Sequence, residues 1–343
     1  MPDPESSLRL CLRSRWDPAA AAGLASGAIR PDWNWEATAS YALAEGLAPL
    51  LYAQLARGDL WRSLPTGVQN TLALAYEGNA IRSAALLTGL EEVLERLRRA
   101  DVPVLVLKGA AIAERLYGDP ALRPMCDLDL LVHEGDVGRA LAALVAGGYA
   151  ATRVGERPGI TIAYENEIAL ARPGLIGITV ELHWRLFDSP FHQRHVPTDW
   201  FWETATPLHV AGGAARGLGA TALFLYLAGH LMLHHRGQGL RWWLDLAELI
   251  HREGKQLDWP ALLAHAEAFA LILPLQATLA TLVEAWGVPI APEILARANA
   301  LVPSAAERRV YHRLCAAQRP AIRRLWSDLA DLPTWSARGR LAW

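Results

Sequence analysis

Two aspartates separated by a single leucine, Asp127 and Asp129, have the spacing in this sequence that points most directly to chemistry. The run Asp-Leu-Asp-Leu-Leu-Val is typical of a strand with one polar and one apolar face. Residues two apart on a strand project from the same face, so both carboxylates should point the same way. A divalent cation such as Mg²⁺ or Mn²⁺ would relieve their repulsion. For this pattern alone, a pair of solvated aspartates is the alternative interpretation.

A third carboxylate lies in a segment that could form a neighbouring strand. In the segment 176–184, apolar residues alternate with polar ones that include Glu181 and His183. If this segment pairs beside 126–133, Glu181 joins the two aspartates on one polar face, which gives the third acid that a two-cation site needs. His183 shares that face and could orient a metal-binding carboxylate.

Basic residues and a glycine precede the aspartates. Lys108 and Gly109 follow the apolar segment 104–107, which we interpret as a buried strand, and they open a helical pattern. A glycine permits close approach of the backbone, and free N–H groups at a helix start favour phosphate oxygens. Arg123, on the loop before the aspartates, could reach a phosphate or hold a carboxylate. In this order, these features favour a site for metal and phosphate over solvated aspartates.

The segment that carries these residues alternates strands and helices, and then adds consecutive strands. Strands are expected at 104–107, 126–133, 160–171, 176–184 and 207–210. The sequence on either side has helical periodicity, which predicts a first helical run from about 33 to 55 and, among the helices of the C-terminal half, one at 240–253. We therefore predict an α+β fold in which a small mixed β-sheet is flanked by helical regions. The expected division is a helical N-terminal region, 1–100, a sheet-containing core, 101–210, and a helical C-terminal domain, 211–343.

Composition argues against several classes of protein. The chain of 343 residues has 33 basic and 35 acidic side chains, a net charge of −2, which argues against a protein that binds nucleic acid along its whole face. Hydrophobic residues make up 52% and charged residues 20%, enough for a sizeable core. Three scattered cysteines, Cys11, Cys126 and Cys315, indicate neither a disulfide framework nor a cysteine-rich zinc site, and fit a reducing cytosol.

The most apolar stretch, 217–233, is shorter than the roughly 20 residues that span a bilayer, and it contains His230. We interpret it as a buried helix. The first 16 residues have no apolar segment typical of a signal peptide. We therefore expect a soluble, cytoplasmic protein with no membrane partner.

Weaker patterns lie in the C-terminal half. His230 and His234 have a spacing that can bind zinc, but no third ligand stands at a diagnostic distance, so structural histidines are the simpler interpretation. Arg241 and Asp245 could form an ion pair on one helical turn with Trp242 packed inward, whereas the alternative is a phosphate on Arg241 or a base on Trp242. A solvated helix face or an RNA-binding surface would explain the arginines at positions 308, 309, 313, 319, 323 and 324.

Together, the central motifs resemble those of poorly characterised bacterial nucleotidyltransferases of the polymerase-beta-like superfamily. The motifs that carry the resemblance are Leu107-Lys108-Gly109, Leu116-Tyr117-Gly118-Asp119-Pro120, Arg123, Asp127-Leu128-Asp129-Leu130-Leu131-Val132 and Glu181-Leu182-His183-Trp184. The resemblance is strong over 102–184 and looser over the rest of the chain. One departure is Gly109-Ala110, where the superfamily usually has Gly-Gly or Gly-Ser, so a hydroxyl contact to phosphate is missing.

The resemblance implies transfer of an NMP from an NTP to a hydroxyl, with release of pyrophosphate. Asp127 and Asp129 would chelate Mg²⁺ or Mn²⁺ on the triphosphate, and both would hold a second cation with Glu181, which could also serve as general base. The residues expected to contact the nucleotide are Lys108, Gly109, Ala110, Arg123, His183 and Arg241. The acceptor stays open among protein, peptide, tRNA and small molecule.

Two other functions remain open at this stage. A glycosyltransferase can hold a nucleotide sugar through a cation on two aspartates so spaced, but that fold normally has a larger parallel sheet with a nucleotide-binding strand well before them. A non-catalytic nucleotide-binding module of the same fold need not keep all three acids. Both alternatives fit this sequence less well than nucleotidyl transfer.

Overall fold

The computed structural model describes residues 3–25, 33–58, 60–152 and 165–315. Within these residues, seven strands form one mixed sheet in the order β3-β4-β5-β2-β1-β7-β6. The strands are β1 (Leu105–Val106), β2 (Leu128–Leu131), β3 (Ala150–Ala151), β4 (Glu167–Arg172), β5 (Ile178–His183), β6 (Thr206–Val210) and β7 (Gly213–Gly217). The pairs β1–β7 and β2–β5 are parallel, and the other neighbours are antiparallel. The predicted mixed sheet is confirmed.

Helical regions precede and follow the sheet in the sequence, as predicted. The N-terminal helices are α1 (Pro4–Arg13), α2 (Pro18–Ala25), α3 (Trp35–Ala44), α4 (Ala48–Leu55), α5 (Leu60–Ser63) and α6 (Thr66–Arg99). Those within the core are α7 (Lys108–Tyr117), α8 (Val137–Ala146), α10 (Pro190–His195) and α11 (Asp199–Glu203). The C-terminal helices are α12 (Ala220–Leu233), α13 (Leu240–Glu253), α14 (Trp259–Ala268), α15 (Ile272–Glu284), α16 (Pro292–Ala300) and α17 (Ala305–Cys315).

The two faces of the sheet have different neighbours because side chains alternate along each strand. Leu128 and Leu130 of β2, with Val180 and Leu182 of β5, belong to an apolar cluster that includes side chains of α6 and α8. The other face of these strands carries Asp129, Glu181 and His183, and α12 lines the cavity on that side through Tyr226 and His230. One face is thus sealed by helices, and the other is left for polar side chains.

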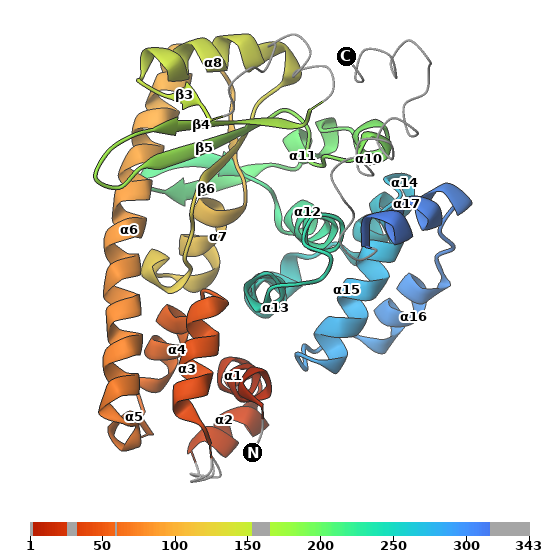
Figure 1. Ribbon diagram of the computed structural model, residues 1–343. Helices are drawn as coiled ribbons and strands as arrows, with labels where there is room; N and C mark the ends of the chain where they lie inside the picture. Colours follow the sequence, from red (N-terminus) through yellow and green to blue (C-terminus); the bar gives the residue numbers. More distant parts are fainter. Residues whose placement is uncertain (1–2, 26–32, 59, 153–164, 316–343) are drawn as a thin grey trace.

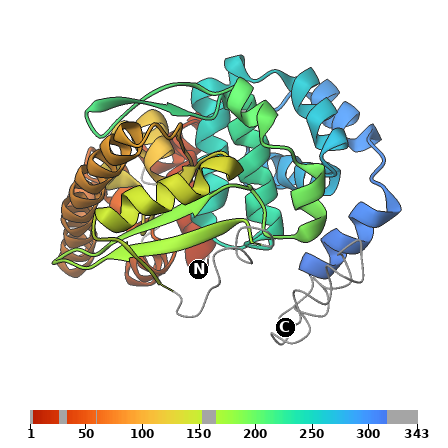
Figure 2. The same cartoon turned by 90° about the horizontal axis from the view of Figure 1, so that it is seen from above.

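Figure 1 shows α6 running beside both the N-terminal helices and the sheet, so one element spans the two regions. Its apolar stripe, which includes Leu86, Leu90 and Val93, packs against the sheet. Figure 2 shows the C-terminal helices α14 to α17 on the opposite side of the molecule from α6. Between them, α12 and α13 pack against each other and α13 packs on α7. The long helix therefore holds one side of the core, and the C-terminal helices hold the other.

The observed elements differ from the expected ones at several places. The first helical run is divided between α3 and α4 at Gly46, whose backbone has a φ of 68°. The sheet continues past residue 210 to β7, since Gly213–Gly217 pairs with both β6 and β1. The strand expected at 160–171 is observed as β4, and its first residues, 160–164, lie outside the described part of the chain.

The apolar stretch 217–233 forms the buried helix α12. Across the described ranges, we find no helix whose length and apolar character would let it cross a membrane.

Candidate active site

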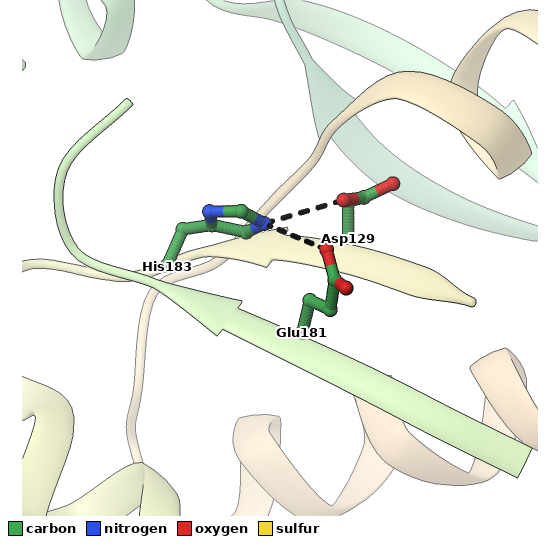
Figure 3. A group of neighbouring side chains, drawn as sticks. All are labelled: Asp129, Glu181 and His183. Atoms are coloured by element: carbon green, nitrogen blue, oxygen red, sulfur yellow. Dashed lines mark hydrogen bonds and ion pairs between the residues drawn. The ribbon is translucent and has the colours of Figure 1, made fainter. Parts of the chain in front are cut away.

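Adjacent parallel strands bring the predicted carboxylates together. Asp129 of β2 pairs directly with Glu181 of β5, and Leu131 pairs with His183, in the parallel register of the two strands. The side chains of Asp129, Glu181 and His183 therefore project from one face, and Figure 3 shows the three pointing toward one another. Asp127, just before β2, is half-buried and lines the same cavity. The expected pairing of these strands is observed.

A buried lysine neutralises one of these acids. The Lys108 ammonium lies 2.7 Å from Asp129 Oδ1, and both side chains are almost fully buried. Burial opposes each charge, but the two groups favour each other's charged form, so the pKa of Lys108 is raised and that of Asp129 is lowered. The predicted role of Lys108 toward phosphate stays a prediction, since in this structure its charge is directed at a carboxylate.

A fourth acid, Glu167, was not found from the sequence. It opposes His183 across the antiparallel β4–β5 pair, and its Oε2 lies 3.0 Å from His183 Nδ1. The other ring nitrogen, Nε2, lies 3.2 Å from Asp129 Oδ1 and 3.7 Å from Glu181 Oε2. The imidazole therefore sits between three carboxylates. The sequence signal for it is the alternation of the large apolar side chains Ile168 and Leu170 with Glu167 and Ala169, which places Glu167 on the other face of a strand.

Burial and charge shift the titration of these groups. Burial, and after it the charges of Asp129 and Glu167, raises the pKa of Glu181 to about 7. Burial disfavours protonated His183, but Asp129 and Glu167 outweigh it and raise the pKa of His183 to about 9. Burial likewise opposes ionised Glu167, but His183 lowers the pKa of Glu167 to about 2. Burial, followed by the charge of Asp129, raises the pKa of Asp127.

The arrangement can hold a divalent cation. Asp129, Glu181 and His183 each offer one ligand atom, and these atoms lie within 4.8 Å of one another. Two carboxylate oxygens and one imidazole nitrogen form a donor set that divalent metals use in proteins. The residues present therefore fit a divalent metal ion. The set that the structure brings together contains His183 in place of Asp127. The set expected from the sequence, Asp127, Asp129 and Glu181, stays a prediction.

Side chains of α6 hold the loop that leads to the aspartates. Asn79 Nδ2 donates a hydrogen bond of 2.6 Å to the Ala121 carbonyl. Arg82 donates to the Met125 carbonyl at 3.2 Å. Gly109 fits against this loop, because an added Cβ would lie 3.2 Å from Arg123 Nη1. The absence of a side chain at this position thus serves packing within the protein, in addition to any approach of a ligand.

Arg123 forms a buried ion pair. Its guanidinium lies 2.8 Å from Asp245 Oδ2 of α13, and the Tyr117 hydroxyl donates a 2.7 Å hydrogen bond to Asp245 Oδ1. The pair predicted between Arg241 and Asp245 is thus not the one formed. Asp245 instead links α13 to α7 through Tyr117 and to the loop before the aspartates through Arg123. Of the two roles suggested for Arg123, holding a carboxylate is the one observed.

Arg241 and an aromatic wall complete the cavity. The Arg241 guanidinium lies 4.8 Å from the Trp242 ring centroid and donates to the Pro124 carbonyl. No carboxylate within 4.0 Å pairs with Arg241 among the residues the structure describes. His235 stacks on Trp242 with ring centroids 4.4 Å apart, and His230 stacks on His234 at 5.0 Å. Burial lowers the pKa of Arg241, with Arg123 adding to the shift.

These groups enclose a cavity of about 230 Å³ between the sheet and α12–α13. Its lining includes the four acids, Lys108, Gly109, Arg123, His183, Arg241 and the three wall histidines, so most of the predicted site residues share one space. Cys126, next to Asp127, is the exposed one of the three cysteines and also lines the cavity. Ala110 is buried in the first turn of α7. Of the C-terminal arginines, 319, 323 and 324 lie outside the described residues.

The chain matches one protein family over most of its length. A family model described as an uncharacterised nucleotidyltransferase matches residues 31–287. Among solved structures, the chain is similar to an antigenic nucleotidyltransferase-like protein from Paracoccidioides brasiliensis, with 19% sequence identity and a TM-score of 0.38. That similarity covers 66% of this chain and 98% of the other. No curated protein matches the sequence.

Proposed function

Since the chain belongs to the uncharacterised nucleotidyltransferase family, we propose that it transfers an NMP from an NTP to an acceptor hydroxyl. In this reaction a bond forms between the acceptor oxygen and the α-phosphorus, the bond from the α-phosphorus to the β-bridging oxygen breaks, and pyrophosphate leaves. The observation that carries the proposal is the direct pairing of Asp129 with Glu181 at one wall of a cavity that Asp127 also lines.

The acidic wall suits a divalent cation, Mg²⁺ or Mn²⁺. Asp127, Asp129 and Glu181 are the carboxylates that would hold two such ions, with His183 beside them. The ions would supply positive charge for the triphosphate and lower the pKa of the acceptor hydroxyl. The side chain of Glu181 is 25% exposed, whereas those of Asp129 and His183 are almost fully buried. An acceptor hydroxyl can therefore reach Glu181, which can also take the hydroxyl proton.

The chain's own cations suit the phosphates. Arg241 faces the cavity with no carboxylate partner among the described residues, so its guanidinium is free to bind a phosphate oxygen. Lys108 and Gly109 open α7, whose first turn has no side-chain cap, and uncapped N–H groups favour an anion. Arg123 contributes mainly by holding Asp245 and so fixing α13, which carries Arg241. The acceptor stays open among the four classes named above.

The test uses NTPs labelled with ³²P. The full chain is incubated with each of the four NTPs, labelled at the α- or the γ-phosphate, with Mg²⁺ or Mn²⁺ and with protein, peptide, tRNA and small-molecule fractions of a cell extract. We expect α-label and no γ-label on an acceptor. Asp127→Asn, Asp129→Asn and Glu181→Gln should each lower transfer about a hundredfold or more. The control Asp101→Asn changes a fully exposed acid and should transfer normally.

Three results would contradict the proposal. Transfer of the γ-label would indicate a phosphotransferase. Turnover of a nucleotide sugar, with no transfer from NTPs, would indicate the glycosyltransferase alternative. NTP binding without transfer to any fraction would indicate a non-catalytic module.

A further inference from the structure

We propose that His183 is a direct ligand of the catalytic metal, that Glu167 orients its ring, and that the site therefore prefers Mn²⁺ or another transition ion over Mg²⁺. This inference rests on the metal site of the proposed function and goes beyond it, since it assigns a nitrogen ligand, a positioning residue and a metal preference. It is carried by the geometry of the β4–β5–β2 strands.

The position of His183 points its Nε2 at the metal-binding carboxylates. That nitrogen lies 3.2 Å from Asp129 Oδ1 and 3.7 Å from Glu181 Oε2, and Figure 3 shows all three groups converging. The side chain is only 2% exposed, so it is held in place by the strands around it. A cation placed among the two carboxylates would meet Nε2 as its third neighbour.

Glu167 fixes which nitrogen faces the metal. Its carboxylate lies 3.0 Å from His183 Nδ1, on the far side of the ring from Asp129. In this structure Nε2 donates to Asp129 Oδ1. A carboxylate beside Nδ1 holds the proton on that nitrogen, so Nε2 is the nitrogen that gives up its proton and offers its lone pair when a cation binds among the carboxylates. This is the arrangement by which acids outside the coordination sphere orient histidine ligands. The pairing of Glu167 with His183 follows from the β4–β5 register.

A purely structural role for His183 is a weaker explanation. Asp129 already has a buried cationic partner in Lys108 at 2.7 Å, so a histidine is not needed to balance that one acid. Among the described residues that line the cavity, four carboxylates, of Asp127, Asp129, Glu167 and Glu181, surround one cation besides His183 that forms an ion pair with them, Lys108. Of the two arginines there, Arg123 is paired with Asp245 and Arg241 donates to the Pro124 carbonyl. The remaining negative charge calls for a further cation, and Nε2 lies where that cation would bind.

The nitrogen ligand sets the metal preference. Mg²⁺ takes oxygen ligands and keeps several waters, whereas divalent transition ions gain affinity from a nitrogen ligand, Mn²⁺ the least of the series and the later ions more. A site with two carboxylates and one imidazole should therefore bind Mn²⁺ more tightly than Mg²⁺. Replacing the imidazole with an oxygen donor should remove most of that difference.

The experiment observes the ligand directly. Mn²⁺ is bound to the full chain, and electron spin echo envelope modulation detects nitrogen coordinated to the ion. We expect a ¹⁴N signal that becomes a ¹⁵N signal when only histidines carry ¹⁵N, and that is lost in His183→Asn. The control His209→Asn changes an exposed histidine of β6, away from the cavity, and should keep the signal.

Competition between metals measures the preference. In the wild type, we expect the Mg²⁺ concentration that gives half-occupancy of the site to be much higher than the corresponding Mn²⁺ concentration. The ratio of these two concentrations should fall at least tenfold in His183→Asn. Glu167→Gln should weaken Mn²⁺ binding about 10- to 100-fold while the nitrogen signal remains. Thermal unfolding, monitored by circular dichroism, checks that each variant is folded. The wild type with ¹⁵N-labelled histidines tests nitrogen ligation without any substitution.

The outcomes separate this inference from the proposed function. Mn²⁺ bound with no histidine nitrogen signal, or an unchanged metal ratio in a folded His183→Asn, would overturn the inference, and nucleotidyl transfer could still proceed. A histidine signal without nucleotidyl transfer would leave the inference standing and overturn the proposed function. Failure of the wild type to bind Mn²⁺ at millimolar concentration would overturn the inference.

Discussion

At the scale of single residues, the site is a set of buried charges that depend on one another. The carboxylate of Asp129 pairs with both Lys108 and His183. The ammonium of Lys108, among the described residues, forms an ion pair with Asp129 alone. Removing one member of a buried pair leaves the other charge without compensation, which costs more than the pair itself contributes. Because Asp129 has a second partner and Lys108 does not, removing Asp129 should destabilise the fold more than removing Lys108.

We expect Asp129→Ala to destabilise the fold by about 3–5 kcal/mol, because it leaves Lys108 buried and unpaired. Lys108→Met should cost clearly less, since Asp129 keeps His183. The double variant should be more stable than Asp129→Ala alone. Urea unfolding of the three proteins measures these differences.

The exposed pair of Glu95 and Arg98 on α6 provides the control, and Glu95→Gln should leave the unfolding midpoint unchanged within error. Equal losses for Asp129→Ala and Lys108→Met would mean that His183 does not support Asp129.

Which site residues the sequence predicts depends on how far apart the partners lie. Period-two alternation within the segments 126–133 and 176–184 predicts one polar face for Asp127, Asp129 and Glu181, and in the structure all three line the same cavity. Glu167 was missed because its contact with His183 depends on the register of β4 against β5, which no local pattern sets. Asp245 was paired with the wrong arginine because Arg123 lies 122 residues away in the chain.

At the scale of elements, the cavity depends on where α12 begins. Gly219 precedes this helix, and an added Cβ would lie 2.6 Å from the Thr204 carbonyl oxygen. A backbone atom cannot move aside as a flexible side chain can. The close approach of these two backbones therefore fixes α12, which supplies Tyr226 and His230 to the cavity wall.

We expect Gly219→Ala to lower the free energy of unfolding by about 1–3 kcal/mol, through displaced backbone at the start of α12. Gly138→Ala is a matched control on α8, since nothing lies within 4 Å of its added Cβ. There the alanine should be neutral or stabilising by up to about 1 kcal/mol. Urea unfolding compares the two, and equal effects would contradict the argument from the Thr204 carbonyl.

The sequence predicts elements with strong periodicity better than short or unusual ones. The helix expected at 240–253 is observed with those bounds as α13, because its apolar residues recur on one face. By contrast, β7 has the sequence Gly-Ala-Ala-Arg-Gly, which contains no β-branched or aromatic residue. It becomes a strand through its pairing with β6 and β1, and such tertiary pairing leaves no local signal.

At the scale of the whole molecule, the helical regions at the two ends share one apolar core. A single cluster of buried residues includes Leu8 and Leu12 of α1, Leu50 of α4, and Leu246 and Leu249 of α13. The division into three parts at 100 and 210 stays a prediction, but the parts are joined by continuous packing. The walls of the cavity come from two of them.

A buried histidine at the junction of these parts should make stability depend on pH. His192 of α10 is 1% exposed, with its ring against Phe187 and Phe191, and it faces the charges of His195 and Arg313. Burial, assisted by those charges and opposed by a contact with the Ala270 backbone, lowers the pKa of His192 to about 4. The ordinary value is 6.5.

The sign follows from linkage. Above pH 6.5 the histidine is neutral in both states, and between 6.5 and about 4 only the unfolded state takes up the proton, so stability falls as the pH falls. We expect this one group to cost up to about 3 kcal/mol across that window. His192→Gln should flatten the pH dependence by that amount, and the exposed control His209→Gln should leave it unchanged. Urea unfolding at pH 7.5 and 4.5 measures both.

The exposed thiol of Cys126 gives the protein a built-in attachment point at the rim of its cavity. Cys11 is fully buried, and the Cys315 thiol, only partly accessible, donates to the Met232 carbonyl. A maleimide fluorophore should therefore couple at Cys126 first, one residue from Asp127. The dye would then report the arrival of a nucleotide by a change in emission, even before the molecule that receives the nucleotide has been identified.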